Sequence, residues 1–173
     1  PAREVVAGFP EHLTFAPSKR RKLARGAVEA FRIAAPHALV IAAGYAIVLD
    51  AMPLAEDSRW GAVALDLATS GVLFGAATFG FVVLFKWLAV RRYRRRAAPM
   101  WTPFVWLSEA ATNLYEGVAV PWFLRYLRGT PWLNDALKLL GADIGRGVYL
   151  DTTDMTEFDC VHIGAHSELN ALC

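Results

Sequence analysis

An apolar run at residues 67–85, followed by the basic segment RRYRRR at 91–96, constrains this chain more than any other feature. Nineteen residues without a formal charge would form a helix of about 28 Å, close to the ~30 Å hydrocarbon thickness of a bilayer. Arginines cannot follow the run into lipid, so we expect them to stop translocation and to stay in the cytoplasm. The run therefore predicts a membrane span.

Composition and charge agree with a membrane protein. Hydrophobic residues make up 55% of the 173 residues, which is high for a soluble domain. Both basic clusters lie within 1–100, whereas 143–173 carries six acids and one arginine, which argues against a nucleic-acid partner and for the lipid bilayer. Two cysteines, Cys160 and Cys173, suit a reducing compartment. We expect no cleavable signal peptide, because the first apolar run begins only after about thirty residues.

A first span is predicted at residues 33–49, with an extension towards residue 55. Pro36 is expected in its first turns, where a missing N–H costs least. His37 leaves two interpretations open: a functional intramembrane group, or a neutral histidine hydrogen-bonded to a neighbouring helix. We prefer the second.

The short polar connection at 51–59 predicts that the two spans form an antiparallel hairpin. A basic segment at 18–25 precedes the first span, with Ser18 as the expected N-cap. It is interpreted as a cytoplasmic anchor, with phosphoinositide or nucleic-acid recognition as alternatives. The positive-inside rule then predicts a multi-pass protein of the cell membrane with both termini cytoplasmic.

Small and charged residues of the second span allow further predictions. Gly71 and Gly75 share one helix face and are expected to contact the first span, with a dimer seam as the alternative. Asp66 and Lys86 stand near the ends of the run, and both are expected to reach the headgroups, Lys86 by snorkelling. No chain of ionisable groups suggests an ion pathway.

Residues 97–140 are rich in aromatic side chains and contain four prolines. The pattern favours helices that lie in the membrane interface with tryptophans at headgroup depth. Core helices of a soluble domain are the alternative.

From residue 140 the pattern changes to an aliphatic residue, a glycine and a polar turn, recurring about every six residues. Such a repeat is typical of a parallel β-helix. The predicted organisation has four parts: a tail and basic interfacial segment at 1–30, a two-span hairpin at 31–96, aromatic linker helices at 97–140, and the first coils of a left-handed, hexapeptide-repeat-like β-helix at 141–173.

Several motifs in the second half resemble the carboxyl-terminal part of the ε-poly-L-lysine synthetase family. These motifs lie at 100–106, 127–131, 145–154, 156–159, 161–164 and 169–170. The resemblance implies one pair of spans and the opening of a soluble acceptor domain related to condensation or hexapeptide acyltransferase folds. It also implies isopeptide-bond formation between carrier-activated amino acids such as lysine.

The same resemblance implies partners and cofactors. The expected partners are adenylation and thiolation domains and the growing poly-amino-acid chain, and we also expect a homo-oligomer. ATP and a phosphopantetheine carrier are implied for upstream domains, and no cofactor or metal is expected in this segment.

Amide formation from a thioester needs a base that keeps the attacking amine neutral. The local groups able to do this are Glu157, Asp159, His162 and His166, and Asn170 or Thr156 could hold an acyl oxygen. The family pattern continues past Asn170 into a Gln-Thr-His segment that this chain does not contain. We therefore expect activity to need a further segment or a second chain.

Two alternatives remain open. The chain could be a non-catalytic membrane anchor that presents a β-helix partner. It could also belong to another hexapeptide-repeat acyltransferase, using an acyl-CoA or acyl-carrier donor.

Overall fold

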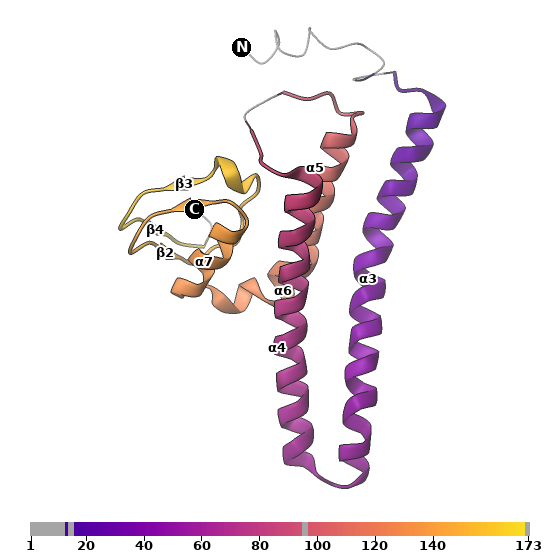
Figure 1. The fold of residues 1–173 in the computed structure, drawn as a ribbon, viewed down its shortest axis with the longest axis vertical. Helices are drawn as coiled ribbons and strands as arrows, with labels where there is room; N and C mark the ends of the chain where they lie inside the picture. Colours follow the sequence, from indigo (N-terminus) through magenta and orange to yellow (C-terminus); the bar gives the residue numbers. More distant parts are fainter. Residues whose placement is uncertain (1–12, 14–15, 95–96, 172–173) are drawn as a thin grey trace.

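Two long antiparallel helices dominate the computed structural model, which describes residues 13, 16–94 and 97–171 (Figure 1). Helix α3 covers Lys19–Glu56 and helix α4 covers Trp60–Phe85, and a π-helical turn, η1, continues α4 over Lys86–Val90. Both helices are long and apolar enough to cross a membrane. The predicted helical hairpin is confirmed; the tail at 1–12 and Arg95, Arg96 and Cys173 lie outside the described residues.

Helix α3 begins well before the predicted span. Ser18 is its N-cap, as predicted, and the Ser18 hydroxyl accepts a hydrogen bond from the Arg21 backbone N–H. Pro36 consequently lies in the interior of α3 and not in its first turns, because residues 19–32 are themselves helical. The His37 ring bonds to the Ile33 carbonyl oxygen of its own helix, with 2.7 Å between Nδ1 and oxygen, and not to a neighbouring helix.

Among the described residues, five short helical elements lie between the hairpin and the first strand. They are α5 (Pro103–Leu114), η2 (Tyr115–Ala119), α6 (Val120–Trp122), η3 (Leu124–Leu127) and α7 (Pro131–Leu139). Prolines begin α5 and α7, where the first N–H has no partner within the helix. These elements therefore start at positions that the local sequence specifies.

The main hydrophobic core lies between α4 and these short elements. Phe79 and Val82 of α4 pack in one cluster with Tyr115, Leu133 and Leu137. The same segment exposes large aromatic side chains elsewhere, namely Trp122, Tyr126 and Trp132. The segment 97–140 thus forms the core layer on one side and carries exposed aromatic groups on the other.

Four strands of two residues each, and a short 3-10 helix, η4 (Phe158–Cys160), complete the described part of the fold. Strand β1 (Asp143–Ile144) pairs in parallel with β3 (His162–Ile163), and β2 (Tyr149–Leu150) pairs in parallel with β4 (Glu168–Leu169). Both ladders join residues nineteen positions apart, so the chain returns once alongside itself. The described strands are too few and too short to establish the predicted left-handed β-helix.

The predicted contact of Gly71 and Gly75 with the first span is wrong. A Cβ on Gly75 would collide with the Trp122 carbonyl oxygen, so this glycine lets α6 approach the backbone of α4. A Cβ on Gly71 would meet nothing within 4 Å. The partner of Gly75 is distant in sequence, and spacing along one helix does not identify it.

Gly75→Ala should destabilise the fold, because the added methyl group forces α6 away from α4. We expect a loss of about 1–3 kcal/mol in the free energy of unfolding, as is usual for overpacking. Gly71→Ala is the matched control and should be neutral or slightly stabilising, since alanine favours a helix more than glycine does. Thermal unfolding of both variants in detergent measures the difference, and equal melting temperatures would contradict the close contact.

Candidate functional site

The loop between β2 and β3 carries several of the predicted site residues. Phe158 anchors it by packing edge-on against Tyr115, with 4.9 Å between the ring centroids. The Tyr115 hydroxyl donates a 2.7 Å hydrogen bond to the Thr153 carbonyl oxygen. Burial raises the pKa of Tyr115, so the hydroxyl keeps its proton and remains a donor. Thr156 and Glu157 are thereby held as exposed residues between two buried anchors.

Thr156 and Glu157 line a polar hollow of about 460 Å³. Helix α5 and helix α3 supply the other walls, so the hollow joins the hairpin to the loop. The remaining lining residues are Arg25, Arg32, Ser108, Glu109, Thr112 and Asn113. Glu157 has a left-handed backbone, with φ of 52°, a conformation that non-glycine residues adopt at a cost.

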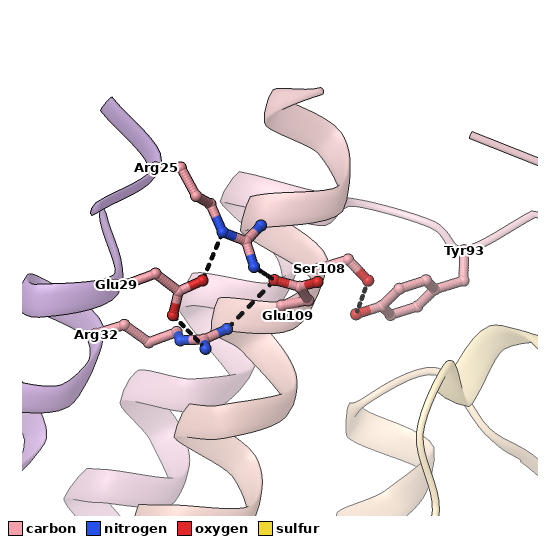
Figure 2. A network of polar contacts seen from close by, with 6 residues as sticks. All are labelled: Arg25, Glu29, Arg32, Tyr93, Ser108 and Glu109. Carbon is pink, nitrogen blue, oxygen red and sulfur yellow. Dashed lines mark hydrogen bonds and ion pairs between the residues drawn. The ribbon is translucent and has the colours of Figure 1, made fainter. Parts of the chain in front are cut away.

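Arg25, Arg32 and Glu109 of this hollow belong to a ring of four charged residues that Glu29 completes (Figure 2). Arg25 contacts Glu29 at 2.5 Å and also pairs with Glu109. Arg32 pairs with Glu29 and lies 3.4 Å from Glu109. Each glutamate therefore bridges both arginines, and the ring ties α3 to α5. The Nη1 atom of Arg25 and the Nε atom of Arg32 are buried without a hydrogen-bond partner among the described residues.

A second polar cluster surrounds Asp159. The Lys86 ammonium lies 2.6 Å from Asp159 Oδ2, and the Tyr93 backbone N–H donates to the same oxygen at 3.0 Å. Lys86 is 1% exposed and also lies 3.7 Å from the Trp87 ring centroid. The predicted snorkelling of Lys86 is wrong, because the loop at Asp159 covers it and supplies its counter-charge.

Tyr93 connects the Asp159 cluster to the polar hollow. Its hydroxyl lies 3.4 Å from the Ser108 Oγ atom, and Ser108 lines the hollow (Figure 2). Burial raises the pKa of Tyr93. Asp159 itself lines a different hollow from Glu157, beside Trp87 and Lys138. The two carboxylates therefore have different surroundings, although they stand two positions apart.

The other candidates lie on exposed surfaces. His162 is 67% exposed, and its Nδ1 atom lies 3.2 Å from Asp143 Oδ2. The Asn170 amide donates to Glu168 Oε1 at 3.1 Å. The His166 backbone N–H donates to the Arg146 carbonyl oxygen at 2.9 Å, and its ring packs against Gly147. None of the three lines the hollow that Glu157 lines.

The charged ring was missed from sequence. The spacing of Arg25, Glu29 and Arg32 places them on one helical face, a pattern that local sequence analysis can detect. Glu109 is separated from them by more than seventy residues, and nothing local links it to α3. Within residues 13, 16–94 and 97–171, no group of three or more His, Cys, Asp or Glu side chains could hold a metal ion.

Lys86→Met should loosen residues 141–171, which contain the four strands, from the hairpin. The substitution leaves the Asp159 carboxylate partly buried without its cation. Breaking one partner of a buried pair costs about 3–5 kcal/mol. Lys138→Met is the control, because among the described residues the Lys138 ammonium pairs only with the exposed Asp135. This variant should lose less than about 1 kcal/mol. Hydrogen exchange across 141–171 measures the effect. Unchanged protection in Lys86→Met would contradict the view that the Lys86–Asp159 pair holds these residues on the hairpin. A Lys86→Met/Asp159→Leu variant should recover part of the loss.

The chain is similar to a curated protein along almost its whole length. Over 173 residues the chain is 53% identical to Delta-poly-L-ornithine synthetase from Acinetobacter baumannii (strain AB307-0294), covering 99% of this chain and 13% of that protein. The chain thus spans about an eighth of the relative's length. No family model matches the chain, and no solved structure is similar to it. Along almost its whole length, the chain is homologous to one segment of a poly-amino-acid synthetase.

Proposed function

We propose that this chain is a segment of a membrane-bound poly-amino-acid synthetase that holds an amide-forming unit at the cytoplasmic face of the cell membrane. The 53% identity to the poly-L-ornithine synthetase carries this proposal. The hairpin supports it, because both α3 and α4 have the length and composition of membrane spans. Lysine and ornithine both carry a terminal side-chain amine, so the proposed substrate class is a diamino acid such as lysine.

The proposed reaction joins two amino acids through a side-chain amine. The amine attacks the thioester carbonyl of a carrier-bound aminoacyl group, a C–N bond forms, and the C–S bond breaks to release the carrier thiol. A base must accept the proton that the attacking amine loses. In this proposal ATP and the phosphopantetheine carrier belong to other domains of the synthetase, and adenylation and thiolation domains are its partners, together with the growing chain.

Glu157 is the base that the geometry favours. Its carboxylate lines the hollow, and no hydrogen bond or ion pair holds it among the described residues. Thr156, beside it, offers a hydroxyl that can donate to an acyl oxygen. The hollow, at about 460 Å³, lies within the range of small-molecule sites. Asp159 is less suited, because Lys86 and Tyr93 already occupy one of its oxygens.

His162 is a second candidate base. Asp143 lies 3.2 Å from its Nδ1 atom, which favours the tautomer that leaves Nε2 free to accept a proton. Its exposed position would suit an encounter with a carrier domain. A continuation of the two strand ladders into a left-handed β-helix in the complete protein would give this face more neighbours, and we retain that fold as part of the proposal.

The topology can be tested at the turn between the helices. In a cysteine-free variant of the complete protein, Ser58→Cys should react with a membrane-impermeant maleimide in intact cells, because the proposed orientation puts the turn outside. Ser18→Cys is the control at the opposite end of α3 and should react only after permeabilisation. The reverse pattern would exclude the cytoplasmic orientation.

Glu157→Gln in the complete synthetase should lower polymer formation by about 10²–10⁴-fold, the range for loss of a general base. Loading of the carrier with amino acid should be unchanged. Glu168→Gln is the control, because Glu168 is an exposed glutamate of the same unit that contacts only Asn170 through its side chain among the described residues. Polymer yield and product composition by mass spectrometry measure the effect and identify the amino acid.

Other outcomes would favour other functions. Loss of polymer in His162→Ala and Asp143→Asn, with Glu157→Gln active, would move the base to His162. Full activity in all three variants would favour the membrane scaffold. Amide formation from acyl-CoA without a loaded carrier would favour another acyltransferase.

A further inference from the structure

A second cavity lies between α3, α4 and α5, and it is almost entirely apolar. It has a volume of about 840 Å³ and is lined by small and aromatic side chains, among them Ala35, Ala43, Ala77 and Phe81. Its lining on α3 extends from Ala27 to Ala43, about 24 Å at about 1.5 Å per residue. We call it the interhelical groove. Its length and lining suit an extended hydrocarbon chain.

One end of the interhelical groove carries positive charge. Arg32 lines both this groove and the polar hollow. Its Nε atom and the Nη1 atom of Arg25 are buried without a hydrogen-bond partner among the described residues, although the Arg25 guanidinium lies over the Trp106 ring. An unpaired buried N–H is unfavourable, so both atoms favour a ligand that accepts hydrogen bonds.

The charge around this end favours an anion. The ring formed by Arg25, Glu29, Arg32 and Glu109 is balanced within itself, with two positive and two negative groups. Glu157 adds one negative charge in the adjoining hollow. The first turn of α3 adds four positive charges, on Lys19, Arg20, Arg21 and Lys22, so the surplus at this end is positive. Arginine N–H groups match the geometry of phosphate oxygens.

We propose that the interhelical groove binds one acyl chain of an anionic phospholipid, and that Arg25 and Arg32 hold its phosphate. A helix of a second copy would fill the groove but would leave the two N–H groups unpaired. A free phosphate would satisfy them but would leave the groove empty. A phospholipid satisfies both requirements, because its charge and its hydrocarbon are linked in one molecule.

This inference rests on the membrane location that we propose for the hairpin. Failure of that location would appear as release of the complete protein from membranes by alkaline carbonate. Failure of the lipid site alone would leave the protein in the membrane fraction. The two failures are therefore distinguishable.

The test uses the complete protein, purified in mild detergent, stripped of lipid, and titrated with phosphatidylglycerol while native mass spectrometry counts bound lipids. Ala43→Phe places a ring in the groove, and Arg32→Gln removes one phosphate donor. Each should weaken phosphatidylglycerol binding about tenfold, which corresponds to about 1.4 kcal/mol. Ala42→Phe is the matched control, since Ala42 is exposed and does not line the groove.

Three results would overturn the proposal. Equal binding of phosphatidylcholine, unchanged by Arg32→Gln, would exclude recognition of the phosphate by the arginines. Inorganic phosphate that binds with no lipid bound would show an anion site only. Dissociation of a dimer by Ala43→Phe, with lipid binding unchanged, would assign the groove to a second copy. Melting temperatures of all variants check that each is folded.

Discussion

Lys86 ends an apolar helix, yet its ammonium group is shielded from solvent and paired with Asp159. A buried ammonium is strongly unfavourable unless an opposite charge and hydrogen bonds accompany it. Here the counter-charge comes from a loop 73 residues further along the chain, and the Tyr93 backbone N–H binds the same carboxylate. The position of the loop on the hairpin therefore depends on this pair, and so does the hollow that Glu157 lines.

Helix α4, which ends just before Lys86, has two parts with different surroundings. Near its C-terminal end, Phe79 and Val82 are buried against Tyr115 and the short helices. Towards its N-terminal end, Leu65, Val72 and Leu73 are exposed. Gly75 marks the change, because α6 meets the backbone there. In the proposed orientation, lipid covers the N-terminal part, whereas protein covers one face of the C-terminal part and leaves Phe81 and Leu84 exposed.

The aromatic side chains near Gly75, where α6 meets α4, are of the kind found at a membrane–water interface. Trp122 packs edge-on against Phe74, with 5.5 Å between ring centroids. Together with Arg125, Tyr126 and His37, it lines a small hollow where α3 passes the short helices. Trp, Tyr and Arg are the residues that favour headgroup depth.

The sequence alone predicted the elements that depend on a local pattern of residues. The hairpin followed from the length and hydropathy of two segments, and the six-residue repeat indicated parallel strands. Lys86 was misjudged, since its neighbours in sequence are apolar and its partner Asp159 is not local. The candidate residues were recognised as chemical groups, but their separation in space was not predicted. Glu157 lines the hollow and Asp159 binds Lys86. His162 is exposed on β3, and Asn170 is exposed just after β4. Tertiary packing decides which carboxylate remains unpaired.

The charged ring has a further consequence for how the site is held. Ala51 is the one fully buried residue among the described residues of α3, so packing alone fixes this helix weakly. Arg25 and Arg32 each pair with two glutamates, one of which, Glu109, belongs to α5. Displacement of α3 would break both links at once, and it would change the interhelical groove and the hollow together because Arg32 lines both. An occupant of the groove that moved Arg32 would therefore change the geometry of the hollow as well.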